Sequence, residues 1–254
     1  MIKGLYSAFS AMEAAWKYQE VLANNIANAN TAGFKREVTA KESFADILLS
    51  QQAPVVAPFP SRIQAVVGQI GTGSFIADFV TDWAQGALQG TGEELDLGLS
   101  GGFFTIETPE GEQFLTRDGR FSRDAAGDLV TSQGNYVLDI DGQHINLPAE
   151  RVDVGPSGEV ITAAGDVIAR ISVNDYGPND LTRSGEGHFT ATIGGTPIEG
   201  TVRQGYLERS NANLVEDMTS LLAVQRTFQA NQTIISSLDR TLDQATGQLG
   251  TYGR

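Results

Sequence analysis

The two ends of the chain carry apolar residues at helical spacing, whereas the middle does not. Near the N-terminus the apolar positions alternate steps of four and three residues, which is the seam spacing of a coiled coil. This N-terminal seam consists of Leu5, Phe9, Met12, Trp16, Ala23 and Ile26, with Gln19 as its polar member. Asn28, Asn30 and Gly33 tolerate the left-handed backbone with which many helices end. We therefore predict an N-terminal assembly helix within residues 1–30.

The C-terminal segment repeats an apolar residue every seven positions. The repeat consists of Leu207, Leu214, Leu221, Phe228, Ile235, Leu242 and Leu249. The interleaved positions Gln225, Gln232 and Asp239 are polar, so this seam is only half apolar. A helix of roughly 35 residues is much longer than the mean of about 11–12, and such helices usually pack along another helix. We predict a C-terminal assembly helix within residues 205–254 that pairs with the N-terminal helix.

Residues 31–80 show no sustained period. The apolar residues at 44–49 are compatible with a short helix. Three prolines at positions 54–60 exclude regular helix there, because proline lacks the backbone N–H and fixes its own backbone angle. We predict a linking region over residues 31–80.

Residues 81–204 show short apolar stretches that are separated by turn signals. Candidate strands lie at residues 103–108, 113–117, 120–122, 129–131 and 136–140. Turn signals every 8–12 residues with short strands between them are typical of an all-β domain. The predicted fold class is therefore mixed α and β, with long terminal helices that form a coiled-coil-like pair and a central all-β domain over residues 81–204.

Composition excludes several kinds of chemistry. The formal net charge is −14, and residues 75–165 hold 16 acidic and four basic side chains, so nucleic acid is not expected as a partner. No run of about 18 apolar residues occurs, which argues against membrane insertion. The chain has no cysteine, and its two histidines, His144 and His188, cannot build a multi-histidine metal site on their own. We expect no cofactor and no bound metal.

Three groups of motifs occur in a fixed order along the chain. They are GLYSA at 4–8 with ANNIANANTAGFK at 23–35; LDL at 95–97 with GFF at 102–104, TRDGRF at 116–121 and GDLVT at 127–131; and QGYLERSN at 204–211 with QRTFQAN at 225–231. Together they resemble the basal-body rod proteins of the bacterial flagellum, the FlgF/FlgG group of axial proteins. Residues 2–6 and 70–73 look more like the distal than the proximal rod protein. A proximal rod or hook-type axial protein is the alternative within the same class.

The resemblance implies a structural subunit and not an enzyme. In this family the terminal helices pair and stack with those of neighbouring copies to form an inner tube, with the β domain outside. The implied partners are further copies of the chain, other rod and hook proteins, the export apparatus and, as a further candidate, the surrounding ring proteins. The implied location is the basal body, in the rod that spans the periplasm.

The N-terminus does not read as a cleavable signal peptide. Lys3 is its only early positive charge, and Glu13, Lys17 and Glu20 interrupt any apolar core of such a signal. The resemblance implies export in the unfolded state through the flagellar type III channel, which uses an uncleaved terminus.

One alternative belongs to another class, a cell-wall hydrolase with a β core. Residues 98–102 fit the G-x-S-x-G nucleophile pattern around Ser100. A nucleophile elbow must open a helix, whereas the residues that follow here are strand-like, so we predict a turn before a strand. A second alternative is that the terminal helices pair within one chain and only cap a monomeric β domain.

Overall fold

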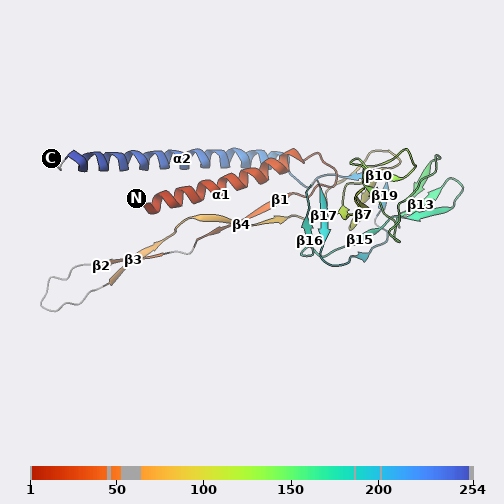
Figure 1. Ribbon diagram of the computed structural model, residues 1–254, viewed down its shortest axis with the longest axis horizontal. Coiled ribbons are helices and arrows are strands. Elements are labelled where there is room, and N and C mark those ends of the chain that lie inside the picture. Colours follow the sequence, from red (N-terminus) through yellow and green to blue (C-terminus); the bar gives the residue numbers. More distant parts are fainter. Residues whose placement is uncertain (1, 45–46, 53–63, 186, 201, 252–254) are drawn as a thin grey trace. The chain divides into compact units, whose positions relative to one another are not determined.

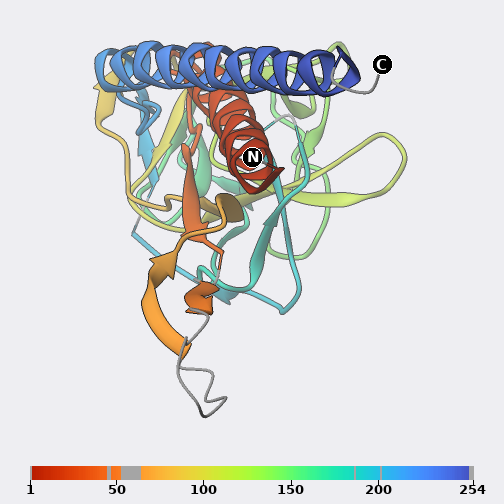
Figure 2. The same ribbon diagram turned by 90° about the vertical axis from the view of Figure 1, so that its left-hand side faces the viewer.

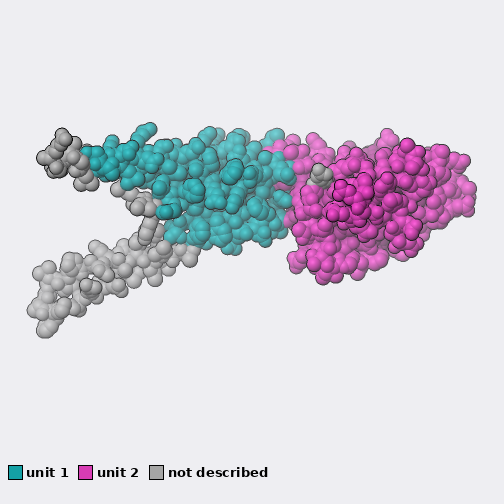
Figure 3. All heavy atoms as spheres, in the orientation of Figure 1, with its two compact units in different colours: residues 1–24, 37–80, 215–254 teal, residues 25–36, 81–214 magenta. Residues whose placement is uncertain are grey.

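The structure is a computed structural model that describes residues 2–44, 47–52, 64–185, 187–200 and 202–251. The chain divides into two compact units, which are coloured separately in Figure 3. Unit 1 comprises Met1–Asn24, Glu37–Val80 and Val215–Arg254, and unit 2 comprises Asn25–Arg36 and Thr81–Leu214. Most of each terminal helix therefore belongs to unit 1, and the chain passes from one unit to the other at residues 24–25, 36–37, 80–81 and 214–215.

Two helices occur among the described residues, and the second carries start signals that the sequence supplies. Helix α1 spans Ile2–Ala27 and helix α2 spans Leu214–Thr251 (Figure 1). Glu216 and Asp217 lie in the first turn of α2, where negative charge stabilises the helix dipole. Just before α2, the hydroxyl of Ser210 accepts a hydrogen bond from the backbone N–H of Ala212 at 3.1 Å.

The remainder of unit 1, in its described part, is built from two strand pairs, of which β2–β3 is antiparallel. Strand β1 (Glu37–Ser43) pairs with β4 (Ser74–Thr81), and β2 (Ile47–Gln52) pairs with β3 (Gln64–Ile70). The short helix predicted at residues 44–49 is therefore wrong, because a partner strand supplies the backbone hydrogen bonds of residues 47–52. The prolines at 54–60 lie outside the described residues.

Unit 2 consists mainly of short antiparallel strands. They are β5 (Leu88–Gly90), β6 (Leu97–Leu99), β7 (Phe103–Glu107), β8 (Gln113–Thr116), β9 (Phe121–Arg123), β10 (Leu129–Thr131), β11 (Tyr136–Val137), β12 (Val152–Val154), β13 (Glu159–Thr162), β14 (Val167–Arg170), β15 (Val173–Asp175), β16 (Leu181–Arg183), β17 (His188–Ala191), β18 (Thr196–Pro197), β19 (Val202–Gln204) and β20 (Tyr206–Glu208). Nine of these strands form one sheet, in which β16, β17, β8, β7, β11, β10 and β9 follow one another and β15 and β18 lie off this path. The other strands pair as β12–β13–β14, β19–β6 and β20–β5.

Two apolar clusters form the core of unit 2. The larger contains Phe104, Ile106 and Val137, none of which is measurably exposed. The smaller contains Phe103, Leu115 and Phe189, with Trp83 packed edge-on against Phe189 at 5.1 Å between ring centres. Alternate residues of the central strands fill these clusters, so the β-rich middle agrees with the pattern seen in the sequence.

The predicted coiled-coil-like pair of terminal helices is wrong. Their backbones do not run alongside each other at close spacing within the described residues, and α1 and α2 run in clearly different directions in Figure 2. Helix α1 buries Ala8, Ala15 and Leu22, whereas Phe9 and Trp16 of the predicted seam are 56% and 57% exposed. At 100° per residue, the buried face lies about a quarter turn from the predicted seam. Small side chains allow a closer approach than bulky ones, so packing within the unit uses the alanine face.

Candidate assembly surfaces and the buried charge cluster

Helix α1 presents a row of exposed aromatic side chains. Tyr6, Phe9 and Trp16 are 68%, 56% and 57% exposed, and their steps of three and seven residues place them on one side of the helix. We call these three residues the aromatic stripe. Glu13 lies beside the stripe and forms an ion pair with Lys17 at 3.1 Å. An exposed apolar patch rimmed by charges is typical of an interaction site.

Helix α2 carries a stripe of half-buried positions along most of its length. The heptad stripe consists of Leu221, Val224, Phe228, Asn231, Ile235, Leu238, Leu242 and Ala245. Its steps alternate three and four residues, which is coiled-coil spacing. The interleaved positions proposed from the sequence, Gln225, Gln232 and Asp239, lie one residue later and are exposed. The heptad stripe is therefore more apolar than the sequence interpretation allowed.

Asn231 is the polar member of the heptad stripe. Its side-chain Nδ2 is shielded from solvent and has no hydrogen-bond partner in the described part of the chain. A buried amide without a partner costs about 1–3 kcal/mol. In coiled coils, a single polar residue at such a position sets the register at a cost in stability.

The other predicted seam residues are dispersed. Leu5, Met12 and Ile26 are half-buried on α1. Leu214 is the first residue of α2 and is 38% exposed. Leu207 lies in β20 of unit 2 and not on the helix, and the side chain of Leu249 lies outside the described residues.

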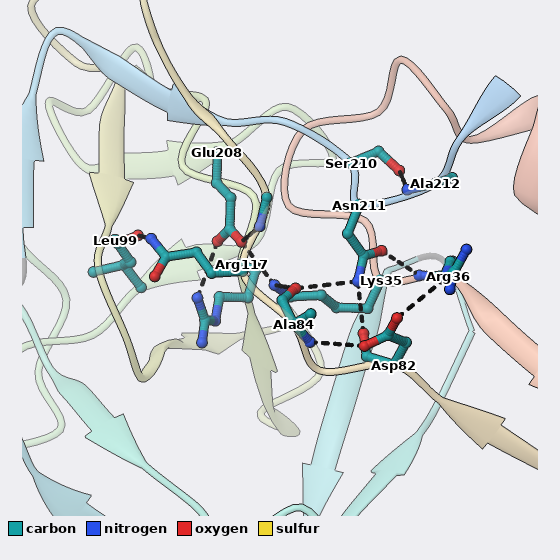
Figure 4. Close-up of polar contacts among 12 residues, drawn as sticks. Lys35, Arg36, Asp82, Ala84, Leu99, Arg117, Glu208, Ser210, Asn211 and Ala212 are labelled. Carbon is teal, nitrogen blue, oxygen red and sulfur yellow. Dashed lines mark hydrogen bonds and ion pairs between the residues drawn. The ribbon is translucent and has the colours of Figure 1, made fainter.

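A cluster of three charged side chains lies inside unit 2 (Figure 4). The Lys35 ammonium is 2.7 Å from Glu208 Oε1, and Nη1 of Arg117 is 3.0 Å from Glu208 Oε2. The side chains of Lys35 and Glu208 are 1% exposed and that of Arg117 is 8% exposed. We call these three residues the charge cluster. It holds two cations and one carboxylate, so Glu208 is the residue on which both pairs depend.

Neighbouring groups add further contacts to the charge cluster, although Nε of Arg117 is buried without a hydrogen-bond partner among the described residues. Lys35 Nζ also donates to the carbonyl of Ala84 at 2.9 Å, and the Gly86 N–H donates to Glu208 Oε1 at 2.8 Å. The guanidinium of Arg117 lies over the Phe103 ring at 4.7 Å. Burial lowers the pKa of the Lys35 ammonium below its ordinary value, and the Glu208 carboxylate opposes this shift.

Asn211 forms a second polar network beside the charge cluster. Its Oδ1 accepts the backbone N–H of Arg36 at 2.7 Å, and its Nδ2 donates to the carbonyls of Asp82 and Ala84 at 2.8 and 3.1 Å. Arg36 Nε also contacts Asp82 Oδ2 at 3.1 Å. The network therefore joins three segments of unit 2 (Figure 4). One segment follows α1, the second follows β4, and the third precedes α2.

Gly33 allows the first of these segments to approach closely. Its backbone N–H donates to the carbonyl of Glu208 at 2.8 Å, and its φ of 67° is in the left-handed region that favours glycine. A Cβ at this position would collide with the backbone of Arg117. The glycine therefore has a packing role beyond that of ending α1.

The comparisons with known proteins match the segments that meet in the charge cluster. Residues 5–35 match the family "Flagella basal body rod protein", residues 100–169 match "Flagellar hook protein FlgE/F/G D1 domain", and residues 203–248 match "Flagellar basal body rod FlgEFG protein C-terminal". Each of the three charged residues lies in a different one of these segments.

Full-length relatives decide the assignment. The flagellar basal-body rod protein FlgG of Bacillus subtilis is 32% identical over 263 residues, which cover 96% of this chain and 98% of that protein. FlgG of Agrobacterium fabrum is 33% identical over 94% of this chain and 96% of its own length. The chain belongs to the flagellar basal-body rod protein family. The flagellar hook-basal body complex protein FlhO of B. subtilis is 29% identical over 98% of this chain and 99% of its own.

Membership of the flagellar basal-body rod protein family makes the chain a structural subunit of the flagellar axis and not an enzyme. The hydrolase alternative is therefore wrong. The structure agrees, because Ser100 lies in the turn between β6 and β7, where an elbow would require a helix.

Across the described residues there is no group of three side chains suited to a metal ion. No described helix has both the length and the apolar character to cross a membrane.

The sequence interpretation did not identify Lys35, Arg117 and Glu208 as a site. A partial signal was present, because Lys35 is the single charged residue of the motif at 23–35, whereas the motifs around Arg117 and Glu208 contain further charged residues. Nothing in a linear sequence indicates that residues 35, 117 and 208 meet.

Proposed function

We propose that this family member assembles with further copies of itself into the flagellar rod, through its terminal helices. The observation that carries the proposal is the aromatic stripe of α1, which stays exposed although the opposite face of the helix is buried. Full burial of a large apolar side chain contributes about 1.5–3 kcal/mol, so covering three of them in each contact provides a substantial driving force. A contact between two different surfaces builds a helical filament when its rotation does not close into a ring.

The heptad stripe of α2 supplies the second surface of this proposal. Its members are only half-buried in one chain, so part of their apolar area is left for a neighbour. The unsatisfied amide of Asn231 favours one register of such a contact, because a slipped register leaves it without a partner. The predicted seam residues of both helices, from Leu5 to Leu242, remain the candidate contacts.

More specifically, we propose that the chain belongs to the distal part of the rod, in the section that spans the periplasm. It rests on the likeness of residues 2–6 and 70–73 to distal rod proteins, and proximal rod or hook-type roles are the alternatives. Other rod and hook proteins are the proposed neighbours along the axis, and ring proteins are candidates around it. We propose export through the flagellar type III apparatus without a cleaved signal peptide.

Self-assembly predicts a sharp dependence on concentration. Above a critical concentration, the purified full-length chain should form filaments of constant diameter, because each added copy buries the same surfaces. Analytical ultracentrifugation and negative-stain electron microscopy measure this directly. A chain that stays monomeric up to millimolar concentration would contradict self-assembly, and labelling of isolated basal bodies separates the distal from the proximal position.

A further inference from the structure

Unit 1 contains a hollow beside α1. Its volume is about 370 Å³, and its walls come from α1, β1, β4 and α2. The lining is largely apolar and consists of Ala11, Ala14, Ala15, Tyr18, Thr39, Lys41, Ile76, Val224 and Thr227. A cavity of about 150 Å³ accepts a benzene molecule, so this hollow has room for more than one aromatic ring.

The hollow and the aromatic stripe lie on opposite faces of the same helix. Ala11 is two residues after Phe9 and Ala14 is two residues before Trp16, and two residues correspond to about 200° around a helix. A chain therefore cannot place its own stripe in its own hollow. Copies displaced sideways from one another can do so repeatedly, which makes the contact heterologous and open-ended.

Size and charge both fit the stripe to the hollow. Phe9 and Trp16 are seven residues apart, which is about 10.5 Å along the helix, so two rings can enter side by side. Glu20 lies on the same side of α1 as the stripe and is exposed, as is Lys41 in the hollow wall. Opposite charges at the rim favour this orientation over one in which two aromatic stripes, each with its own glutamates, face each other.

We propose that Phe9 and Trp16 of one copy insert into the hollow of the next copy, with Glu20 near Lys41 of that copy. The inference rests on the proposed self-assembly and states which surface meets which. It makes the hollow a receptor for a second copy of this chain. Each copy then carries one donor face and one receptor face.

Two kinds of full-length variant separate the two faces. Phe9→Ser with Trp16→Ser removes the inserting rings and leaves the hollow intact. Thr227→Trp, or independently Thr39→Trp, fills the hollow from a wall position and leaves the stripe intact. Thr233→Trp is the matched control for Thr227→Trp, because both threonines are exposed on α2 and donate a hydrogen bond to the carbonyl four residues earlier. Ile193→Ser, at a residue 62% exposed in unit 2, is the control for loss of an exposed apolar side chain.

Each class of variant should fail to polymerise alone, with unchanged circular dichroism, while both controls polymerise like the unaltered chain. Mixed together, the two classes should form a complex of one copy each, with twice the monomer mass in light scattering, because one receptor face and one donor face remain. A mixture that stays monomeric, while the unaltered chain polymerises, overturns the stripe-in-hollow contact but leaves self-assembly standing. Failure of the unaltered chain to polymerise overturns the proposed function as well.

Discussion

Glu208→Gln should destabilise unit 2 by about 3–5 kcal/mol, the cost of breaking a buried ion pair from one side. The substitution leaves the Lys35 and Arg117 cations buried without their shared anion. Lys35→Met should cost less, because it leaves Arg117 and Glu208 as a balanced pair. Urea unfolding measures the difference. The chain has two tryptophans, so a Trp16→Phe background leaves Trp83 as the single reporter of unit 2.

A surface pair provides the control for Glu208→Gln. Asp153 lies 3.8 Å from Arg151, with both side chains more than two-thirds exposed, so Asp153→Asn should change the free energy of unfolding by less than about 0.5 kcal/mol. The double variant Lys35→Met with Glu208→Gln should cost less than the sum of the two single variants, because one uncompensated cation is removed. Equal costs for Glu208→Gln and Lys35→Met would contradict the assignment of Glu208 as the shared anion.

Phe228→Asp should raise the critical concentration for filament formation strongly while leaving unit 2 folded. Phe228 is a half-buried member of the heptad stripe, and a carboxylate placed in an apolar contact loses several kcal/mol of hydration. A loss of about 3 kcal/mol per contact raises the critical concentration by roughly 100-fold. Sedimentation at a series of concentrations measures that change, and the circular dichroism of the sheet reports the fold.

Thr233→Asp adds the same charge to the same helix away from the heptad stripe. Thr233 is exposed, so the critical concentration should stay within a few-fold of that of the unaltered chain. If Phe228→Asp instead lowers the helical circular dichroism of the monomer, the stripe belongs to the fold of unit 1 in the single chain and not to a contact between copies.

The periodic elements were predictable because their pattern is local. Residues 103–107, 113–116 and 129–131 alternate or run apolar between turn signals, and the structure forms strands there. The long terminal helices follow in the same way from their spacing. The packing of these helices could not be predicted in this way. The large apolar side chains of α1 indicated the wrong buried face, because the small residues Ala8 and Ala15 are buried whereas Trp16 is exposed.

Two further features depended on contacts that are distant in sequence. Leu207 continues the seven-residue repeat but lies in β20, because pairing with β5 overrides helical spacing there. The charge cluster brings residues 35, 117 and 208 together, although each is of a charged type that usually lies at the protein surface. The periodicity of the sequence cannot indicate a contact between residues so far apart in the chain. The motifs around these residues did indicate the family.

The central claim is that assembly covers the exposed faces of the terminal helices and leaves unit 2 outside the principal contact. The most direct measurement is the rate of maleimide labelling at single cysteines, since the natural chain has none. Ala23→Cys lies on the exposed side of α1, and Ala125→Cys is an equally small change at an exposed turn of unit 2. Filament formation should slow labelling at position 23 by at least about tenfold and leave position 125 unchanged. Protection of position 125 with free labelling of position 23 would contradict the account.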